Sequence, residues 1–278
     1  MVKQNRGDKM RKAVIGFIFG ALLTLSIGVY AVPEVLSARF TEDKFLYNGQ
    51  EYDMRIAAVH SADEQWPSTY IKVSDMARAL GGKAYSTGTH IVIESGPEFV
   101  AKACKDSCVM IYAYQNDLPY QGSGWVYKGY IITAEHVIRN ADRIEVFPDD
   151  SVYGAYATVE YADPDIDFAV LKLDRDFGLP SVTLGDSDKL VEGQKLVAIT
   201  SPAGVKNVID ECLYSGMVFT DAGELMGISE ENMIGGSSGG AIFNIDGELV
   251  AMNIRGNEGS NFAIPINDLK PILQKLIK

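Results

Sequence analysis

The sequence predicts an all-β domain over residues 98–278, preceded by an apolar helix and by a small module of mixed α and β structure. The all-β prediction rests on runs of apolar, β-prone residues, among them 108–112, 129–133 and 168–173. With 278 residues, 47% of them hydrophobic, the chain can bury the core of one large domain or of two smaller ones.

The first segment, residues 1–12, is basic and is followed by an apolar stretch from Ala13 to Val32. This stretch is long enough to cross a bilayer as a helix, and the cations before it would stay in the cytoplasm. We therefore expect a single-pass anchor in the cell membrane, with the rest of the chain outside the cytoplasm. The alternative is a signal peptide cleaved after Ala31 or Ala38, which would release a secreted protein. The length of the stretch favours the anchor.

Residues 41–96 predict a compact, β-rich module with one helix. Asn48-Gly49 indicates a hairpin over 45–52. Ser74 is expected to cap a helix through Leu80, which Gly81 and Gly82 end. Further strands are expected at 69–73, 83–86 and 89–93.

The order of these elements is similar to that of the copper amine oxidase N-terminal-like domain. The name of this family does not imply a metal here. His60 and His90 are the only histidines of the segment and no cysteine lies within it, which is a weak signal for a metal site. We expect no metal site and no cofactor. The module is interpreted as a spacer or as an interaction domain for a cell-wall or surface ligand.

Gly96-Pro97 marks the expected boundary of the all-β domain, since proline restricts the residue before it and glycine frees the chain. A helix-like stretch over 98–105 leads into the first strand. At the other end, Asn267 is expected to cap a last helix that reaches Ile277.

Charge and cysteine content narrow the classes of partner and site. The formal net charge of −12 argues against nucleic acid, because phosphate binding needs a basic face. The cysteines are Cys104, Cys108 and Cys212, and an odd number outside the cell leaves at least one unpaired. A Cys104–Cys108 bridge and buried free thiols both remain open. No glycine-rich frame surrounds any of the three, which argues against a cysteine nucleophile.

Three residues have the types and contexts of a nucleophilic triad. Ser238 stands in the run 235–240 among four glycines, where a side chain is exposed beside bare backbone amides. His136 follows a β-prone run that ends in Thr133-Ala134, the place of a base carried at a strand end. Asp167 directly precedes the apolar run 168–173 and would orient the imidazole.

The order His, Asp, Ser resembles that of the trypsin-like serine proteases. The sequence motifs around these residues are most similar to those of the HtrA (DegP-like) branch. The segments that carry the resemblance are Gly122-Ser123-Gly124-Trp125, Thr133-Ala134-Glu135-His136-Val137, Asp167-Phe168-Ala169-Val170-Leu171, Ser201-Pro202-Ala203-Gly204, Gly236-Ser237-Ser238-Gly239-Gly240 and Asn261-Phe262-Ala263-Ile264-Pro265. The resemblance implies a double β-barrel and peptide-bond hydrolysis. After the last helix we expect no PDZ domain, which often follows such a protease.

The resemblance further implies a role for each residue near the nucleophile. Ser238 would attack the peptide carbonyl, with His136 as base and Asp167 as orienting acid. The backbone N–H groups of Gly236 and Ser238 would form the oxyanion hole. The chain departs from the usual Gly-Asn-Ser-Gly-Gly-Pro by having Ser237 and Ala241 around the nucleophile. Ser237 can still form a short side-chain hydrogen bond, so we expect the change to be tolerated.

The primary specificity pocket implied by the family is lined by residues on both sides of the nucleophile. These are Asn232, Met233, Ile234, Ile254, Arg255 and Gly256. Because Asn232 stands where a trypsin would place an aspartate, no preference for Lys or Arg is expected. A medium-sized apolar side chain is the hypothesis.

Two functions of different classes follow from these patterns. The first is a membrane-tethered serine endopeptidase acting on exported or misfolded proteins, with protein or peptide substrates. The second is a catalytically silent relative that binds surface ligands through its N-terminal module. The presence of all three triad residues favours the enzyme.

Overall fold

The computed structural model divides the chain into two compact units, residues 1–95 and 96–278. The residues it describes are 35–40, 45–47, 50–52, 56–61, 68–79, 82–86, 91–220, 223–229, 233–257 and 260–277. The predicted anchor at 13–32 lies outside these ranges. Of the helices within them, none is both long and apolar enough to span a bilayer.

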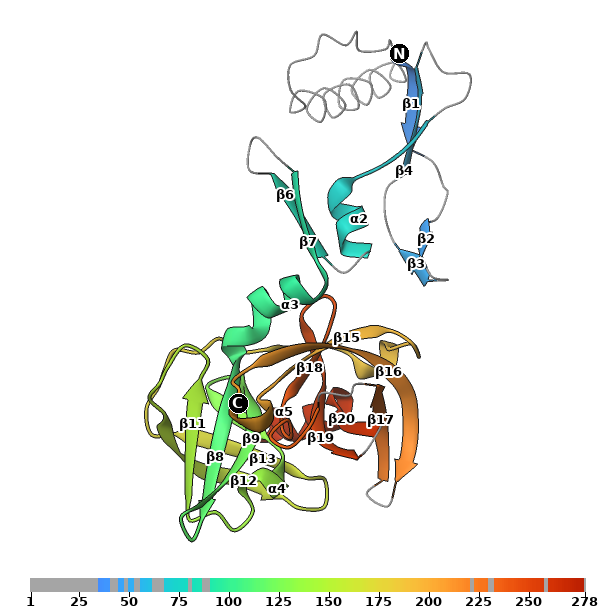
Figure 1. Cartoon of the computed structure of the whole chain (residues 1–278). Coiled ribbons are helices and arrows are strands. Elements are labelled where there is room, and N and C mark those ends of the chain that lie inside the picture. The colour runs from blue at the N-terminus through green and yellow to red at the C-terminus, as the bar shows by residue number, and fades with distance from the viewer. Residues whose placement is uncertain are drawn as a thin grey trace. The chain divides into compact units, whose positions relative to one another are not determined.

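The described part of the first unit contains a three-stranded antiparallel sheet, two hairpins and a helix (Figure 1). The sheet has the order β1 (Val35–Phe40), β4 (Ile56–Ser61), β5 (Ser68–Ile71), and the hairpins are β2 (Phe45–Tyr47) with β3 (Gln50–Tyr52) and β6 (Gly82–Ser86) with β7 (Ile91–Ser95). Phe45 lies opposite Tyr52, so the hairpin predicted over 45–52 is confirmed. His60 belongs to β4, and His90 lies outside the described residues.

The predicted cap of the helix in this unit is wrong. Helix α2 (Val73–Ala79) begins one residue before Ser74. The carbonyl oxygen of Lys72 accepts hydrogen bonds from the backbone N–H groups of Asp75 and Met76, at 2.9 and 3.0 Å. Since β5 ends at Ile71, the chain turns at Lys72 and Ser74 is already helical. Its hydroxyl contacts Asp75 instead of capping the helix.

The second unit begins with a helix and a closed antiparallel barrel. Gly96 and Pro97, predicted to mark the domain boundary, are the first two residues of this unit and of α3 (Gly96–Cys104), where proline lacks only an N–H that would have no partner in the helix. After the short helix η1 (Lys105–Ser107), the barrel order is β10 (Tyr130–Thr133), β13 (Phe168–Leu173), β12 (Ala155–Asp163), β11 (Arg143–Pro148), β8 (Cys108–Gln115), β9 (Leu118–Tyr127).

The first two connections of this barrel are two-residue turns. Asn116 and Asp117 have φ of 49° and 62°, and Lys128 and Gly129 have φ of 48° and 83°. Two consecutive positive φ angles match the right-handed twist of a hairpin, which explains the use of Asn, Asp and Gly here. Helix α4 (Glu135–Ile138) follows β10 directly.

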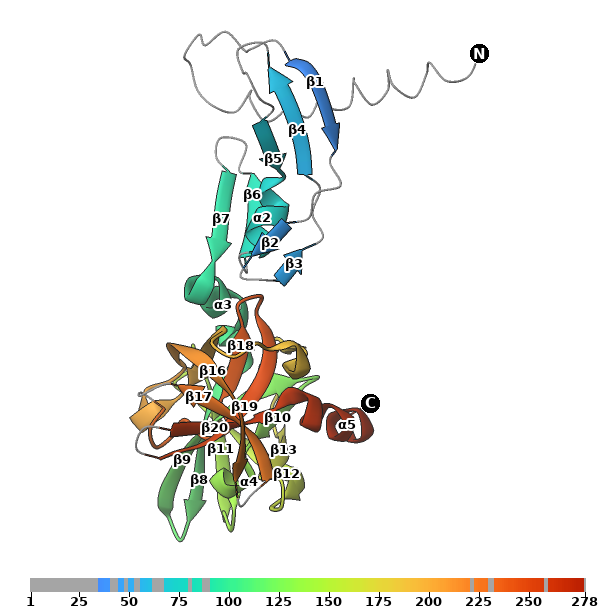
Figure 2. The same ribbon diagram turned by 90° about the vertical axis from the view of Figure 1, so that its right-hand side faces the viewer.

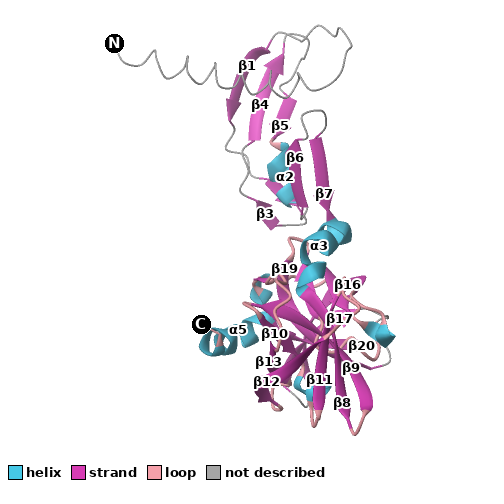
Figure 3. Ribbon diagram, turned by 90° about the vertical axis from the view of Figure 1, so that its left-hand side faces the viewer, coloured by secondary structure: helices cyan, strands magenta, loops and turns pink. Residues whose placement is uncertain are grey.

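A second sheet closes in the same manner. Its order is β14 (Thr183–Leu184), β19 (Glu248–Asn257), β18 (Ala241–Asn244), β15 (Lys195–Thr200), β16 (Val208–Thr220), β17 (Gly223–Ser229), β20 (Ser260–Pro265). Strand β20 also pairs with β19, which closes a ring of the six strands from β19 to β20 and leaves β14 at its edge. The expectation of an all-β double barrel is therefore confirmed, and strands dominate this unit in Figure 3.

The last helix, α5 (Ile266–Leu276), packs at the side of this unit (Figure 2). The predicted cap is again displaced, since the helix begins before Asn267. Ile266, the first residue of the helix, is fully buried. The side-chain amide of Asn267 donates to Asp186 Oδ1 at 2.8 Å, a tertiary contact in place of a cap.

One hydrophobic core runs through both barrels. It includes Trp125, Ile132 and Phe168 of the first barrel, Phe243 and Leu249 of the second, and residues of α3 and α5. A smaller cluster, with Leu196, Met226 and Met233 among its members, fills the second barrel alone. The barrels therefore share buried surface and hold each other in place.

All three cysteines are buried free thiols, so of the two alternatives the structure has the unpaired one. Cys104 donates to the carbonyl oxygen of Gly247 at 3.3 Å, and Cys108 donates to that of Cys104 at 3.6 Å. Burial raises the pKa of the Cys108 thiol well above its ordinary value. It therefore stays protonated at neutral pH.

Candidate active site

His136 and Asp167 meet because the strands before and after them are neighbours. Thr133, the last residue of β10, lies opposite Ala169 in β13. His136 follows β10 on the first turn of α4, and Asp167 precedes β13. Asp167 has a φ of 52°, a conformation that aspartate tolerates better than most residues. The antiparallel register therefore brings a strand end and a strand start to the same rim of the barrel.

The carboxylate of Asp167 holds the histidine by two hydrogen bonds. Oδ2 lies 2.7 Å from Nδ1 of His136, and Oδ1 accepts from the backbone N–H of His136 at 2.8 Å. With the Nδ1 proton directed to the carboxylate, Nε2 is left as the acceptor of the neutral ring. The histidine side chain is 37% exposed, so the ring remains accessible to a reacting group.

The environment keeps Asp167 ionised. Burial raises the pKa of this carboxyl, but hydrogen bonds from the ring and backbone of His136, with the charges of His136 and Arg139, outweigh it. The pKa of Asp167 is therefore below its ordinary value. A carboxylate at this place orients the ring and would stabilise an imidazolium.

Ser238 lies on the turn before β18, pressed against the first barrel. Its carbonyl oxygen accepts from the backbone N–H of Ser123 in β9 at 2.8 Å. The next residue, Gly239, donates to the carbonyl oxygen of Asn253 at 2.6 Å. Ser238 is thus tied to strands of both barrels.

Glycine is required at 239 for two reasons. Its φ of 82° lies in the left-handed region. A Cβ there would also stand 2.3 Å from the carbonyl oxygen of Ser123 and from Thr133 Oγ1, and 3.0 Å from the backbone nitrogen of Ala134. The Ser238 turn therefore packs directly on the residues that lead into His136.

The hydroxyl of Ser238 donates to the carbonyl oxygen of Ile254 at 2.9 Å. In the described part of the chain it makes no hydrogen bond with His136. The structure thus joins His136 to Asp167 and packs the Ser238 turn beside them, with the serine hydroxyl turned toward β19. Catalytic hydrogen bonds are often incomplete without substrate, and rotation about one side-chain bond changes the direction of this hydroxyl.

Two backbone donors beside Ser238 are free. Within the described ranges, no hydrogen bond engages the N–H of Gly236 or of Ser238. The carbonyl of Gly235 accepts from Ala203 N–H at 2.9 Å, and since the peptide is trans, the N–H of Gly236 points away from Ala203. Buried donors without a partner are rare, and Gly236 is buried. These N–H groups are suited to receive an anionic oxygen.

The two unusual neighbours of Ser238 are both accommodated. Ser237 is buried, and its Oγ accepts from Thr200 Oγ1 at 3.2 Å, so the expected side-chain hydrogen bond is present. Ala241 is fully buried and begins β18, opposite Ile199 and Met252. Neither residue disturbs the strand that follows the turn.

The residues predicted to line the specificity pocket are only partly described. Met233 is buried in the smaller cluster of the second barrel, and Ile254 is buried in the main core. Gly256 pairs with Asn261 between β19 and β20, while Asn232 lies outside the described residues. No three His, Cys, Asp or Glu side chains gather as a metal site anywhere in the described ranges.

Sequence reasoning missed the polar residues that support the turn. Thr133, Ser201 and Asn253 are buried and hydrogen-bonded around it, as is Ser123. Gly122-Ser123-Gly124 was recognised as a motif, but no role was given to its serine. The available signal was a small polar residue between two glycines inside a β-prone run.

The comparisons with known proteins agree with this geometry. Residues 122–252 match the family model of the trypsin-like peptidase domain. A probable periplasmic serine endoprotease, DegP-like, of Halomonas elongata is 37% identical over 166 residues, which cover 56% of this chain and 35% of that protein. The serine protease Do-like HtrA of Bacillus subtilis is 30% identical over 229 residues, covering 74% of this chain and 49% of that protein.

The chain thus spans between a third and a half of the length of these two relatives. Among solved structures, the HtrA-type protease AlgW with a tripeptide superposes with a TM-score of 0.59 at 28% identity. That match covers 66% of this chain and 64% of the other. Residues 122–252 thus match the trypsin-like peptidase domain, and the proteins that the chain resembles include HtrA and DegP-like serine proteases.

Proposed function

We propose that this chain is a serine endopeptidase that hydrolyses peptide bonds of exported proteins, including misfolded ones, through Ser238, His136 and Asp167. The observation that carries the proposal is the doubly bonded His136–Asp167 pair beside a glycine-framed serine turn. The carboxylate of Asp167 holds the imidazole in one tautomer, with Nε2 as acceptor. General-base catalysis by a histidine requires this arrangement.

In the proposed reaction, the Ser238 hydroxyl leaves the carbonyl oxygen of Ile254 and turns to Nε2 of His136. Oγ attacks the peptide carbonyl carbon while Nε2 takes its proton. His136 then passes this proton to the leaving amine, and an acyl-enzyme remains on Ser238. Water, deprotonated by the same nitrogen, hydrolyses the acyl-enzyme and restores the serine.

The oxyanion formed in both steps would bind the free N–H groups of Gly236 and Ser238. A donor of this kind contributes about 3 kcal/mol to lowering the barrier, because it is already directed at the place where charge develops. No metal ion or cofactor takes part in this proposal.

A second candidate is a catalytically silent protein that keeps the fold as a scaffold and binds surface ligands through residues 41–96. The hydrogen bond from Ser238 to the carbonyl oxygen of Ile254 favours it, since a serine held there is not activated by His136. Reaction with a serine-directed phosphonate separates the two candidates.

The first prediction concerns the nucleophile. The native chain should react covalently with a fluorophosphonate probe, and Ser238→Ala should abolish labelling because the attacking oxygen is lost. Labelling is measured by intact-mass spectrometry. Ser237→Ala serves as the matched control, since it removes the neighbouring hydroxyl and should retain labelling. A native, folded chain that never reacts would support the scaffold.

The second prediction concerns the orienting acid. Asp167→Asn should lower kcat by about four orders of magnitude. With its oxygen accepting from the backbone N–H of His136, the amide turns its NH2 to Nδ1, donates to it and so stabilises the tautomer that carries the proton on Nε2. Peptidase assays at neutral pH measure the loss. Asp165→Asn is the control, because Asp165 is an exposed carboxylate of the same turn. Equal activity of the two variants would remove Asp167 from the triad.

The third prediction concerns substrate preference. We propose that the pocket near Asn232, Met233, Ile254 and Gly256 takes a medium-sized apolar side chain, because it has no carboxylate at the position of Asn232. Cleavage of a peptide library, read by mass spectrometry, should place such residues before the scissile bond. Dominance of Lys or Arg at that position would contradict the proposal.

The fourth prediction concerns location. We propose that residues 13–32 anchor the chain in the cell membrane and that residues 41–96 act as a spacer or ligand-binding module outside it. The apolar run after a basic segment supports the anchor. The full chain should sediment with membranes and resist alkaline extraction. A shortened soluble chain, beginning after Ala31 or Ala38, would instead establish a cleaved signal peptide.

A further inference from the structure

Ser123 is hydrogen-bonded to the Ser238 turn through both its backbone and its hydroxyl. The residue lies in the middle of β9 and is 1% exposed. Its backbone N–H donates to the carbonyl oxygen of Ser238, and its carbonyl oxygen accepts from Thr133 Oγ1 at 2.7 Å. Its hydroxyl donates to the carbonyl oxygen of Gly236 at 2.8 Å and accepts from Ser201 N–H at 2.7 Å.

The bond to Gly236 controls the direction of a free donor. Gly236 has a φ of 99°, and glycine restricts its own backbone less than any other residue. The peptide before it is held by Ala203 N–H, which donates to the carbonyl of Gly235. The peptide after it is held on its carbonyl side by Ser123 Oγ and on its N–H side by Ser237, which donates to the carbonyl oxygen of Ile234 at 3.0 Å. Together these hydrogen bonds give the N–H of Gly236 a defined direction.

The same hydroxyl also holds the turn that supplies the first of these bonds. Ser201 donates to Ser123 Oγ, and Ala203 follows it in η3 (Pro202–Gly204). Gln121, two residues before Ser123 on β9, donates its side-chain amide to the carbonyl oxygen of Ser201. The start of this turn is therefore fastened to β9 through both the N–H and the carbonyl oxygen of Ser201.

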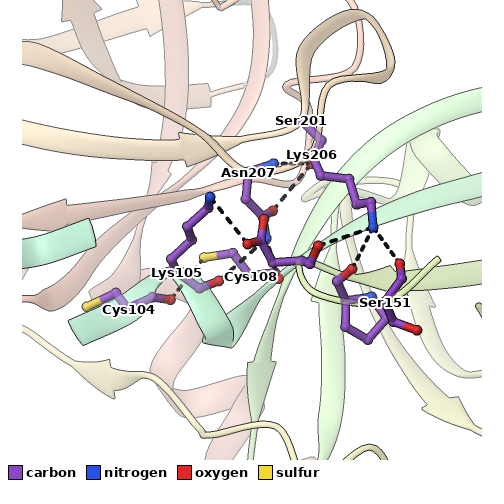
Figure 4. Close-up of polar contacts among 9 residues, drawn as sticks. Cys104, Lys105, Cys108, Ser151, Ser201, Lys206 and Asn207 are labelled. Carbon is purple, nitrogen blue, oxygen red and sulfur yellow. Dashed lines mark hydrogen bonds and ion pairs between the residues drawn. The ribbon is translucent and has the colours of Figure 1, made fainter. Parts of the chain in front are cut away.

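The far end of the turn is fastened as well (Figure 4). Asn207 donates from its backbone N–H to Ser201 Oγ at 3.2 Å and from its side chain to the carbonyl oxygen of Cys108 at 2.8 Å. Lys206 Nζ donates to the carbonyl oxygens of Pro148, Asp149 and Ser151, at 3.0, 3.3 and 2.5 Å. Residues 206 and 207 are therefore held independently of Ser123, and the Ser123 hydroxyl acts on the start of the turn, at Ser201.

We propose that Ser123 is a positioning residue for the oxyanion hole: its hydroxyl directs the N–H of Gly236 by holding the Gly236 carbonyl and the Ser201 turn together. The inference rests on the proposed peptidase function. Without the hydroxyl, the carbonyl of Gly236 and the N–H of Ser201 lose their shared buried partner. The peptide after Gly236 then keeps only its hydrogen bond from Ser237 N–H to Ile234, and the Ser201 turn loses one link to β9. The Gly235–Gly236 peptide can therefore shift, and its N–H no longer meets the developing oxyanion.

The test compares Ser123→Ala with Thr200→Val in the full chain. Thr200 is equally buried, and its hydroxyl bonds to Ser237 in the same turn but does not touch the Gly236 peptide. Ser123→Ala should slow fluorophosphonate labelling and lower kcat by about 10- to 100-fold, the effect of small misplacements of catalytic groups, with a smaller change in KM. Thr200→Val should label and turn over at close to the native rate.

Amide hydrogen exchange of residues 233–240, measured by mass spectrometry, gives a readout independent of activity. Exchange should be faster in Ser123→Ala than in the native chain and in Thr200→Val. Ser123→Cys, which keeps the volume and a weak donor, should lie between the native chain and the alanine variant. If Ser123→Ala does not fold, Ser123→Cys takes its place in both measurements.

Native labelling and exchange in Ser123→Ala would overturn the inference. So would an equal slowing in Thr200→Val, because Ser123 would then contribute only to the packing of the turn. A native chain that is not labelled would overturn the proposed function instead. The exchange comparison would still decide whether Ser123 holds the Gly236 peptide.

Discussion

The contact between the Ser238 turn of the second barrel and the β9–β10 strands of the first is the constraint on which the candidate site depends. The contact is possible only because Gly239 has no side chain, since a Cβ would stand 2.3 Å from two oxygen atoms of the first barrel. The shared hydrophobic core keeps the two barrels at this separation. A change of packing there would move Ser238 relative to His136, even though neither residue lies in the core.

The polar groups of the site follow from this close approach. Backbone groups of Ser123, Gly236 and Ser238 are buried at the junction and must find partners there. Most of them do so across the junction, through Ser123 and Asn253. Within the described part of the chain, the N–H groups of Gly236 and Ser238 have no hydrogen-bond partner. The carboxylate of Asp167 does not depend on this junction. Its partners His136 and Arg139 both belong to the first barrel, and they lower its pKa.

Much of the fold was predictable because its signals are local. Alternating β-prone runs, the Asn48-Gly49 turn and the apolar run after Asp167 each indicate an element by their own residues. Helix starts were predicted less well. Helix α2 begins two residues after β5 ends, and α5 begins directly after β20, in each case one residue before the predicted cap.

The sequence by itself determined the residue types of the site, their order along the chain and the presence of glycines around Ser238. The tertiary structure alone decided which groups meet: that Asp167 bonds to His136 twice, that the Ser238 hydroxyl points to Ile254, and that the Ser123 hydroxyl joins Gly236 to Ser201. The physical reason is that these contacts join segments far apart in the chain. Their geometry depends on strand register and on barrel closure, which no short stretch of sequence encodes.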